Sequence, residues 1–264
     1  TSTWVMNQPH QGARLDESTV KWFLQALAEL RIAAFTSKNE FATQVTINLG
    51  LRKGQPYSLH LKSPHIDNPA LLWAFLPNSE TSISLPTAFA EQIVDPVKAF
   101  RNPYVLDSGF AFDSLEVQGE EKFTLTKDSN NGKWSITKPN VFPADDRLVG
   151  LFLRQLVELR INDFVTDKMT DESRHGIDFP LKTLTFYRPA SSEGAETAPL
   201  TVRFSSEIRN HVMTHRSDEP SIYAVPFGAV MQLPLSAYQL RERTLWTIKS
   251  ETISRIRVIH SEQP

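Results

Sequence analysis

Residues 20–32 read VKWFLQALAELRI and residues 149–161 read VGLFLRQLVELRI, and this repetition decides the fold. The two stretches are offset by 129 (149 − 20), and the apolar positions of the first recur in the second: Val20, Phe23, Leu24, Leu27 and Leu30 as Val149, Phe152, Leu153, Leu156 and Leu159. Trp4 and Pro9 recur upstream of the helix as Trp134 and Pro139, at an offset of 130 (134 − 4). A register kept over a whole helix predicts that one folding unit was duplicated in tandem.

We expect an α+β fold of two similar lobes, each an antiparallel sheet packed against one main amphipathic helix. Successive apolar spacings of three, one, three and three give each helix a stripe wide enough to lie across a sheet. Asp16 and Asp145 stand where a carboxylate can cap the first turn. Residues 43–49, 57–62 and 70–76 indicate short strands, and residues 123–137 a hairpin turning at Asn131-Gly132.

The end of each copy predicts a closing strand and a domain boundary. Phe112, Leu115 and Val117 correspond to Ile253, Ile256 and Val258 at an offset of 141 (258 − 117). The polar residues 118–121 follow the first of these strands, so we expect lobes at residues 1–118 and 119–264. The strand at 123–127 has no counterpart before Trp4, which predicts that the amino-terminal strand of the first lobe is missing from this sequence.

Composition excludes several classes of function. The 264 residues suffice for two domains, and their net charge of −2 favours neither a nucleic-acid partner nor an anionic membrane surface. The chain has no cysteine, so disulfides and thiolate chemistry are excluded. No run of about 18 apolar residues is present, so we expect no direct membrane insertion by residues 1–264.

Four segments of the second copy resemble the bacterial domain of unknown function 4340 family: LTKDSNNGKWSITKP at 125–139, LRINDFV at 159–165, HGIDFP at 175–180 and IYAV at 222–225. The resemblance implies two tandem copies of the family domain, of which the first keeps Trp4, Pro9 and the helix. It implies an extracytoplasmic domain, anchored by an amino-terminal segment absent from this chain, beside ABC-type transport components of the gliding-motility sort. It supplies no catalytic residues.

A metal site is the first chemical hypothesis. His211 and His215 have the spacing that puts two imidazoles on one face of a helix. Residues 210–216, however, are expected to form one arm of a hairpin, and in a strand these histidines would lie about 13 Å apart. We therefore predict no metal site there, and no cofactor.

A ligand site is the second hypothesis. Trp73-Ala74-Phe75 matches Tyr223-Ala224-Val225 at an offset of 150 (223 − 73). A glycan or small ligand lodged between the lobes would then be lined by Trp73, Tyr223, His211 and His215. Trp4 and Trp134 recur beside a helix and a proline, so packing in the core explains them instead.

No catalytic, phosphate-binding or dinucleotide motif is present. The expected function is therefore a non-enzymatic interaction or scaffold module, with protein partners at a membrane that include ABC transporter components. The glycan or small-ligand binding protein is the alternative. A hydrolase is the third hypothesis. It would need a pair of carboxylates across a cleft, and one sequence cannot place such a pair.

Overall fold

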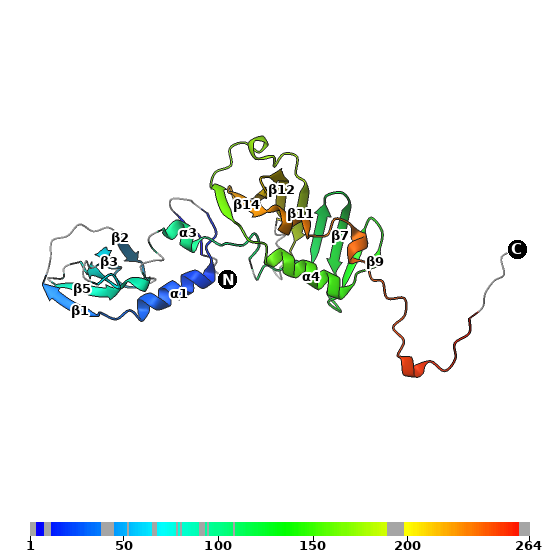
Figure 1. Cartoon of the computed structure of the whole chain (residues 1–264), viewed down its shortest axis with the longest axis horizontal. Coiled ribbons are helices and arrows are strands. Elements are labelled where there is room, and N and C mark those ends of the chain that lie inside the picture. Colours follow the sequence, from blue (N-terminus) through cyan, green and yellow to red (C-terminus); the bar gives the residue numbers. More distant parts are fainter. Residues whose placement is uncertain are drawn as a thin grey trace. The chain divides into compact units, whose positions relative to one another are not determined.

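The computed structural model describes residues 4–7, 12–37, 45–51, 53–64, 68–77, 79, 81–89, 93, 95–107, 109–188 and 198–258. The chain divides into two compact units, Thr1–Pro103 and Tyr104–Pro264, called unit 1 and unit 2 below. Figure 1 shows the helices and strands of each. All strand pairs are antiparallel in the described residues, so the α+β prediction is confirmed.

Unit 1 is a helix on a five-stranded sheet. Asp16 caps α1 (Glu17–Ala28) by accepting a hydrogen bond from the Ser18 amide at 3.0 Å, as the sequence predicts. Phe23 of α1 packs among buried Leu61, Ala74 and Ile83 of the sheet. The strand order is β1 (Ala34–Ser37), β5 (Thr81–Pro86), β4 (Leu71–Phe75), β3 (Tyr57–Pro64) and β2 (Val45–Leu49). Short η1 (Thr87–Phe89) and α3 (Pro96–Phe100) follow.

Unit 2 is a helix on a nine-stranded sheet. Asp145 caps α4 (Asp146–Val157), whose Val149, Phe152 and Leu156 are buried in the main core. The strand order is β10 (Asp163–Thr166), β14 (Ile222–Pro226), β13 (His211–Arg216), β12 (Leu200–Ile208), β11 (Lys182–Tyr187), β6 (Ser114–Gln118), β7 (Lys122–Lys127), β8 (Trp134–Lys138) and β9 (Phe142–Pro143). Short η2 (Ser173–His175), α5 (Phe227–Met231), η3 (Ala237–Leu240) and η4 (Ser250–Thr252) complete it.

Five strands of each sheet have the same order along the chain and the same register. One row of directly paired residues runs across unit 1: Phe35, Ile83, Ala74, Leu61 and Val45. The matching row runs across unit 2: Phe164, Tyr223, Thr214, Phe204 and Lys182. Phe35 and Phe164 keep the offset of 129 (164 − 35) seen in the helices. β2 thus occupies the position of β11, and β3 that of β12.

The expected boundary after residue 118 differs from the division in the structure. β6 lies inside the sheet of unit 2, paired with β11 on one side and β7 on the other. Its Leu115 and Val117 are fully buried in the core of unit 2. The strand cannot close the first lobe because both of its edges are occupied in the second, so the units divide after Pro103.

The expected closing strand at residues 253–258 is also not a strand. These residues pair with no described strand, and Ile256 and Val258 are 81% and 73% exposed. Their counterparts in β6 are buried because β11 and β7 flank them, and this segment has no such neighbours. Trp4 is 46% exposed, so core packing does not explain it, whereas Trp134 packs against the core of unit 2.

The match of Trp73 with Tyr223 is wrong as well. Trp73 lies on β4, which corresponds to β13, whereas Tyr223 lies on β14. In the register of the sheets Tyr223 takes the position of Ile83. The match of residues 73–75 with residues 223–225 rested on three residues alone, and buried strands of one sheet carry similar apolar residues.

Candidate functional site

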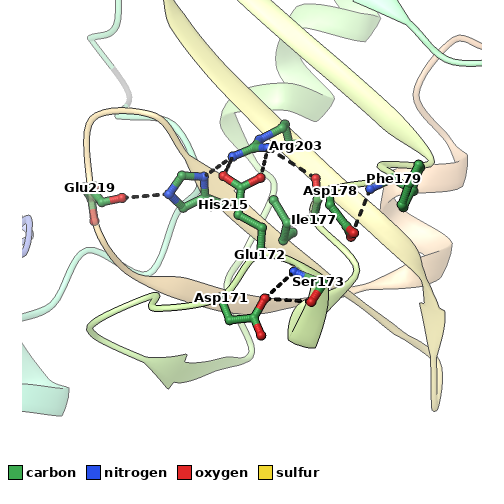
Figure 2. A network of polar contacts seen from close by, with 9 residues as sticks. All are labelled: Asp171, Glu172, Ser173, Ile177, Asp178, Phe179, Arg203, His215 and Glu219. Atoms are coloured by element: carbon green, nitrogen blue, oxygen red, sulfur yellow. Dashed lines mark hydrogen bonds and ion pairs between the residues drawn. The ribbon is translucent and has the colours of Figure 1, made fainter.

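A network of charged side chains covers part of β12 and β13 in unit 2 (Figure 2). Arg203 of β12 is paired across the strands with His215 of β13. Its two Nη atoms donate to the carboxylate of Glu172 at 2.6 and 2.5 Å, and Nη2 donates to His215 Nδ1 at 3.3 Å. The other ring nitrogen of His215, Nε2, lies 3.0 Å from the carbonyl oxygen of Glu219. Arg203 therefore links a carboxylate to an imidazole.

The HGIDFP segment brings Glu172 to this position. Asp171 accepts hydrogen bonds from the amide and hydroxyl of Ser173 at 3.0 and 2.7 Å, which starts η2. Gly176 ends η2 at φ 65°, a conformation that disfavours any side chain. The carbonyl of the next residue, Ile177, then accepts a bond from Arg203 Nη1 at 3.3 Å. The left-handed conformation of Gly176 thus lets the chain turn so that the Ile177 carbonyl faces Arg203.

The network has a definite protonation state. The hydrogen bond from Arg203 lowers the pKa of Glu172, so this carboxylate is ionised at neutral pH. Burial, and then the charge of Arg203, lower the pKa of His215 below its usual 6.5. The ring is neutral at pH 7 and accepts from Arg203 at Nδ1, so Nε2 carries the hydrogen and donates to the Glu219 carbonyl. The neutral imidazole thus joins Arg203 of β12 to the turn after β13.

The stability of unit 2 should fall as the pH decreases below about 6.5, the usual pKa of histidine. The pKa of His215 is lower in the folded state, so its contribution is complete above 6.5 and is lost as the pH falls through the folded value. Urea unfolding of the wild type measured across this range should show the slope, and His215→Gln should flatten it. A slope in His215→Gln equal to that of the wild type would contradict the assignment.

A second cluster of buried charges lies at the β13–β14 turn. Arg216 is almost fully buried and donates to the Asp218 carboxylate at 2.9 and 2.7 Å and to the Val105 carbonyl at 2.5 Å. Its Nε lies 3.4 Å from buried Glu219, which accepts a hydrogen bond from the Tyr223 hydroxyl. These contacts hold residue 105 against the hairpin, so the cluster is structural.

Lys182 is a third buried charge, at the start of β11. Its Nζ donates to the carbonyls of Val230, Leu233 and Pro234 at 3.3, 2.9 and 3.5 Å. Burial lowers its pKa to about 8. The ammonium thus satisfies carbonyls at the end of α5, and its enclosure keeps it from acting as a nucleophile.

The four predicted lining residues belong to both units. Trp73 is partly buried on β4 in unit 1, and the other three belong to unit 2. Tyr223 is buried in the core and pairs with Thr214 of β13. His215 follows Thr214 on that strand, so its side chain lies on the opposite face of the sheet from Tyr223. His211 Nε2 lies 3.1 Å from the Asn162 amide, and its Nδ1 lies 3.0 Å from the Arg209 carbonyl.

His211 and His215 lie on a strand, as the sequence predicts. Within the described residues, no three side chains of histidine, aspartate or glutamate come together in a way that could hold a metal ion. The same part of the chain contains no helix with the length and apolar character needed to cross a bilayer.

An apolar groove in unit 1 is the feature that sequence reasoning missed. It has a volume of about 240 Å³ and extends from β2 at the edge of the sheet to Ile83 and Leu85 of β5. Its walls come mainly from α1 and the segment after it, β2 and β3, including Leu27, Leu30, Ile47, Leu49, Tyr57 and Leu59. In unit 2 the corresponding Leu156, Leu159, Leu184, Phe186, Leu200 and Val202 are buried in one core with Leu115 and Val117 of β6. The groove therefore lies in unit 1 between α1 and the sheet, at positions whose counterparts in unit 2 are buried.

The second half of the chain also matches a known family. Residues 134–264 match one copy of the family described as a domain of unknown function, DUF4340. The DUF4340 match starts at Trp134, so β6 and β7 precede it, and it includes the exposed residues 253–258. No curated protein and no solved structure matches the chain significantly.

Proposed function

We propose that this chain is a non-enzymatic protein-interaction module that binds an extended segment of a partner at the β2 edge of unit 1. The observation that carries the proposal is the apolar groove whose walls include Ile47 and Leu49 of β2. The corresponding Leu184 and Phe186 of unit 2 pair with the fully buried Val117 and Leu115 of β6. Addition of a strand to a sheet edge is a common mode of peptide recognition, in which backbone hydrogen bonds give affinity and side-chain pockets give specificity.

The two units are proposed to be tandem copies of one fold. The common strand order, the common register and the offset of 129 support this. The setting of the module rests on the family resemblance alone: an extracytoplasmic domain, held by an amino-terminal anchor, that serves an ABC-type transport or gliding-motility system. Duplication of a scaffold adds surface for partners, which suits this role.

Affinity purification from detergent-solubilised membranes tests this proposal. The immobilised chain should retain ABC transport components, and Ile47→Asp, which places a carboxylate in the groove, should reduce their recovery roughly tenfold, the equivalent of about 1.4 kcal/mol of binding free energy. Asn48→Asp is the matched control because residue 48 lies on the opposite face of β2 and keeps an oxygen to accept from Ser58. Equal recovery with all three proteins would refute the groove as the binding site.

A further inference from the structure

Two features of this chain correspond to paired elements of unit 2, yet each lacks its partner among the described strands. The first is the β2 edge with its groove, and the second is the exposed segment 253–258. We propose that residues 253–258 of one copy pair antiparallel with β2 of a second copy, as β6 pairs with β11. This inference rests on the proposed function and names the occupant of the groove: another molecule of this protein. Ile47→Asp then lowers the recovery of membrane components because it prevents assembly of the chain.

The β2 edge is suited to accept a strand. Among the described strands it pairs only with β3. Sheet edges that avoid pairing usually carry charges, prolines or bulges. β2 reads VTINL and has none of these. Its Ile47 and Leu49 line the groove and are only partly buried, so a strand laid beside them would complete their packing.

Residues 253–258 are suited to supply that strand. The segment reads ISRIRV, and Ser254, Ile256 and Val258 alternate with Arg255 and Arg257. Such alternation puts Ile256 and Val258 on one face of a strand and Arg255 and Arg257 on the other. Ile256 and Val258 are among the most exposed large apolar residues in the described chain. Their exposure costs solvation free energy that a partner surface would recover.

Unit 2 shows how the two features fit. Ile256 and Val258 correspond to Leu115 and Val117 of β6 at an offset of 141 (256 − 115), and both β6 residues are fully buried. Leu115 pairs with Phe186 and Val117 with Leu184 on β11. Phe186 and Leu184 correspond to Leu49 and Ile47 on β2, because both pairs face matching positions on β12 and β3.

The predicted register follows directly. Ile256 of one copy should lie opposite Leu49 of the other, and Val258 opposite Ile47. Arg257 then takes the position of Glu116, which tolerates a charge because it lies on the less buried face of β6. The groove and the segment are different surfaces of one chain, so the contact is head-to-tail and gives open chains or rings instead of a symmetric dimer.

Cross-linking of two single-cysteine chains tests the register. The chain has no cysteine of its own, so Leu49→Cys in one preparation and Ile256→Cys in another provide the only thiols. Mixing the two with a short bismaleimide should give a cross-linked dimer. Leu49→Cys mixed with Arg257→Cys is the control and should react several-fold less, because alternate residues of a strand point to opposite faces. Equal yields from both mixtures would overturn the register.

Sedimentation of the purified chain over a range of concentrations tests the association itself. The weight-average mass should rise to roughly twice the monomer value or more as the concentration increases. Ile256→Asp should abolish this rise without affecting folding, since residue 256 is exposed, and Arg257→Asp should leave it unchanged because β6 carries an acid there.

Complementation separates this inference from the proposed function. Ile47→Asp leaves the segment intact and Ile256→Asp leaves the groove intact, so an equimolar mixture should form a one-to-one dimer. A chain that stays monomeric at all concentrations would overturn the inference. If Ile47→Asp still lowered the recovery of membrane proteins in that case, the proposed function would stand with a different occupant; if it did not, both would fall.

Discussion

A chain shortened to residues 104–264 should fold by itself and unfold in one cooperative transition, whereas a chain that starts at residue 119 should not. The longer form keeps β6, whose Leu115 and Val117 are fully buried and whose two edges are paired with β11 and β7. Loss of each buried side chain alone costs about 2–4 kcal/mol, and the two ladders are lost as well. The sum approaches the whole stability of a typical domain, about 5–15 kcal/mol.

Circular dichroism with urea titration measures this difference. A synthetic peptide of residues 109–118 provides the control, because it should restore a cooperative transition to the 119–264 chain. The same peptide with Val117→Asp should fail, since residue 117 lies in the core. A 119–264 chain that unfolded like the 104–264 chain would show that β6 is dispensable and that the boundary lies after residue 118.

Replacement of Arg216 by Met should destabilise unit 2 by about 3–5 kcal/mol, the usual cost of breaking a buried ion pair from one side. The side chain is almost fully buried, and its removal takes a guanidinium away from Asp218, from buried Glu219 and from the Val105 carbonyl. Methionine fills similar space without any hydrogen-bond donor, so the carboxylate of Glu219 would stay buried without its nearby cation. Chemical denaturation of the 104–264 chain gives the difference in unfolding free energy.

A surface ion pair provides the comparison for Arg216. Lys21 and Glu17 lie 2.7 Å apart on α1, and both side chains are more than half exposed. Lys21→Met should therefore change the stability of unit 1 by less than about 1 kcal/mol. A loss of the same small size in Arg216→Met would mean that the buried cluster contributes no more than an exposed pair.

Short-range features were predictable from the sequence. The helix caps at Asp16 and Asp145 depend on residues two or three positions away, and the hairpin at Asn131-Gly132 depends on local backbone preference. Apolar alternation correctly indicated β2, β3, β4 and β13. In each of these cases the deciding interaction lies within one element or one turn.

Pairing between distant segments was not predictable in the same way. Alternation identified residues 112–117 as a strand but carried no information on which sheet would receive it, so β6 was assigned to the wrong unit. The network of Glu172, Arg203 and His215 joins residues 12 and 31 positions apart, and it exists only because β12 and β13 adopt one register. The groove of unit 1 is lined by residues from α1, β2, β3 and β5, which lie far apart in the sequence, so no local residue pattern marks it.

The internal position of β6 has a mechanical consequence. The peptide that tethers unit 1 runs directly into a strand held on both sides, so a load applied along this tether is resisted in shear by two ladders of hydrogen bonds acting together. Strands pulled lengthwise in this way must break many bonds at once, in contrast to an edge strand peeled off one bond at a time. A pull along β6 would therefore have to break its ladders with β11 and β7 together before the strand leaves the sheet.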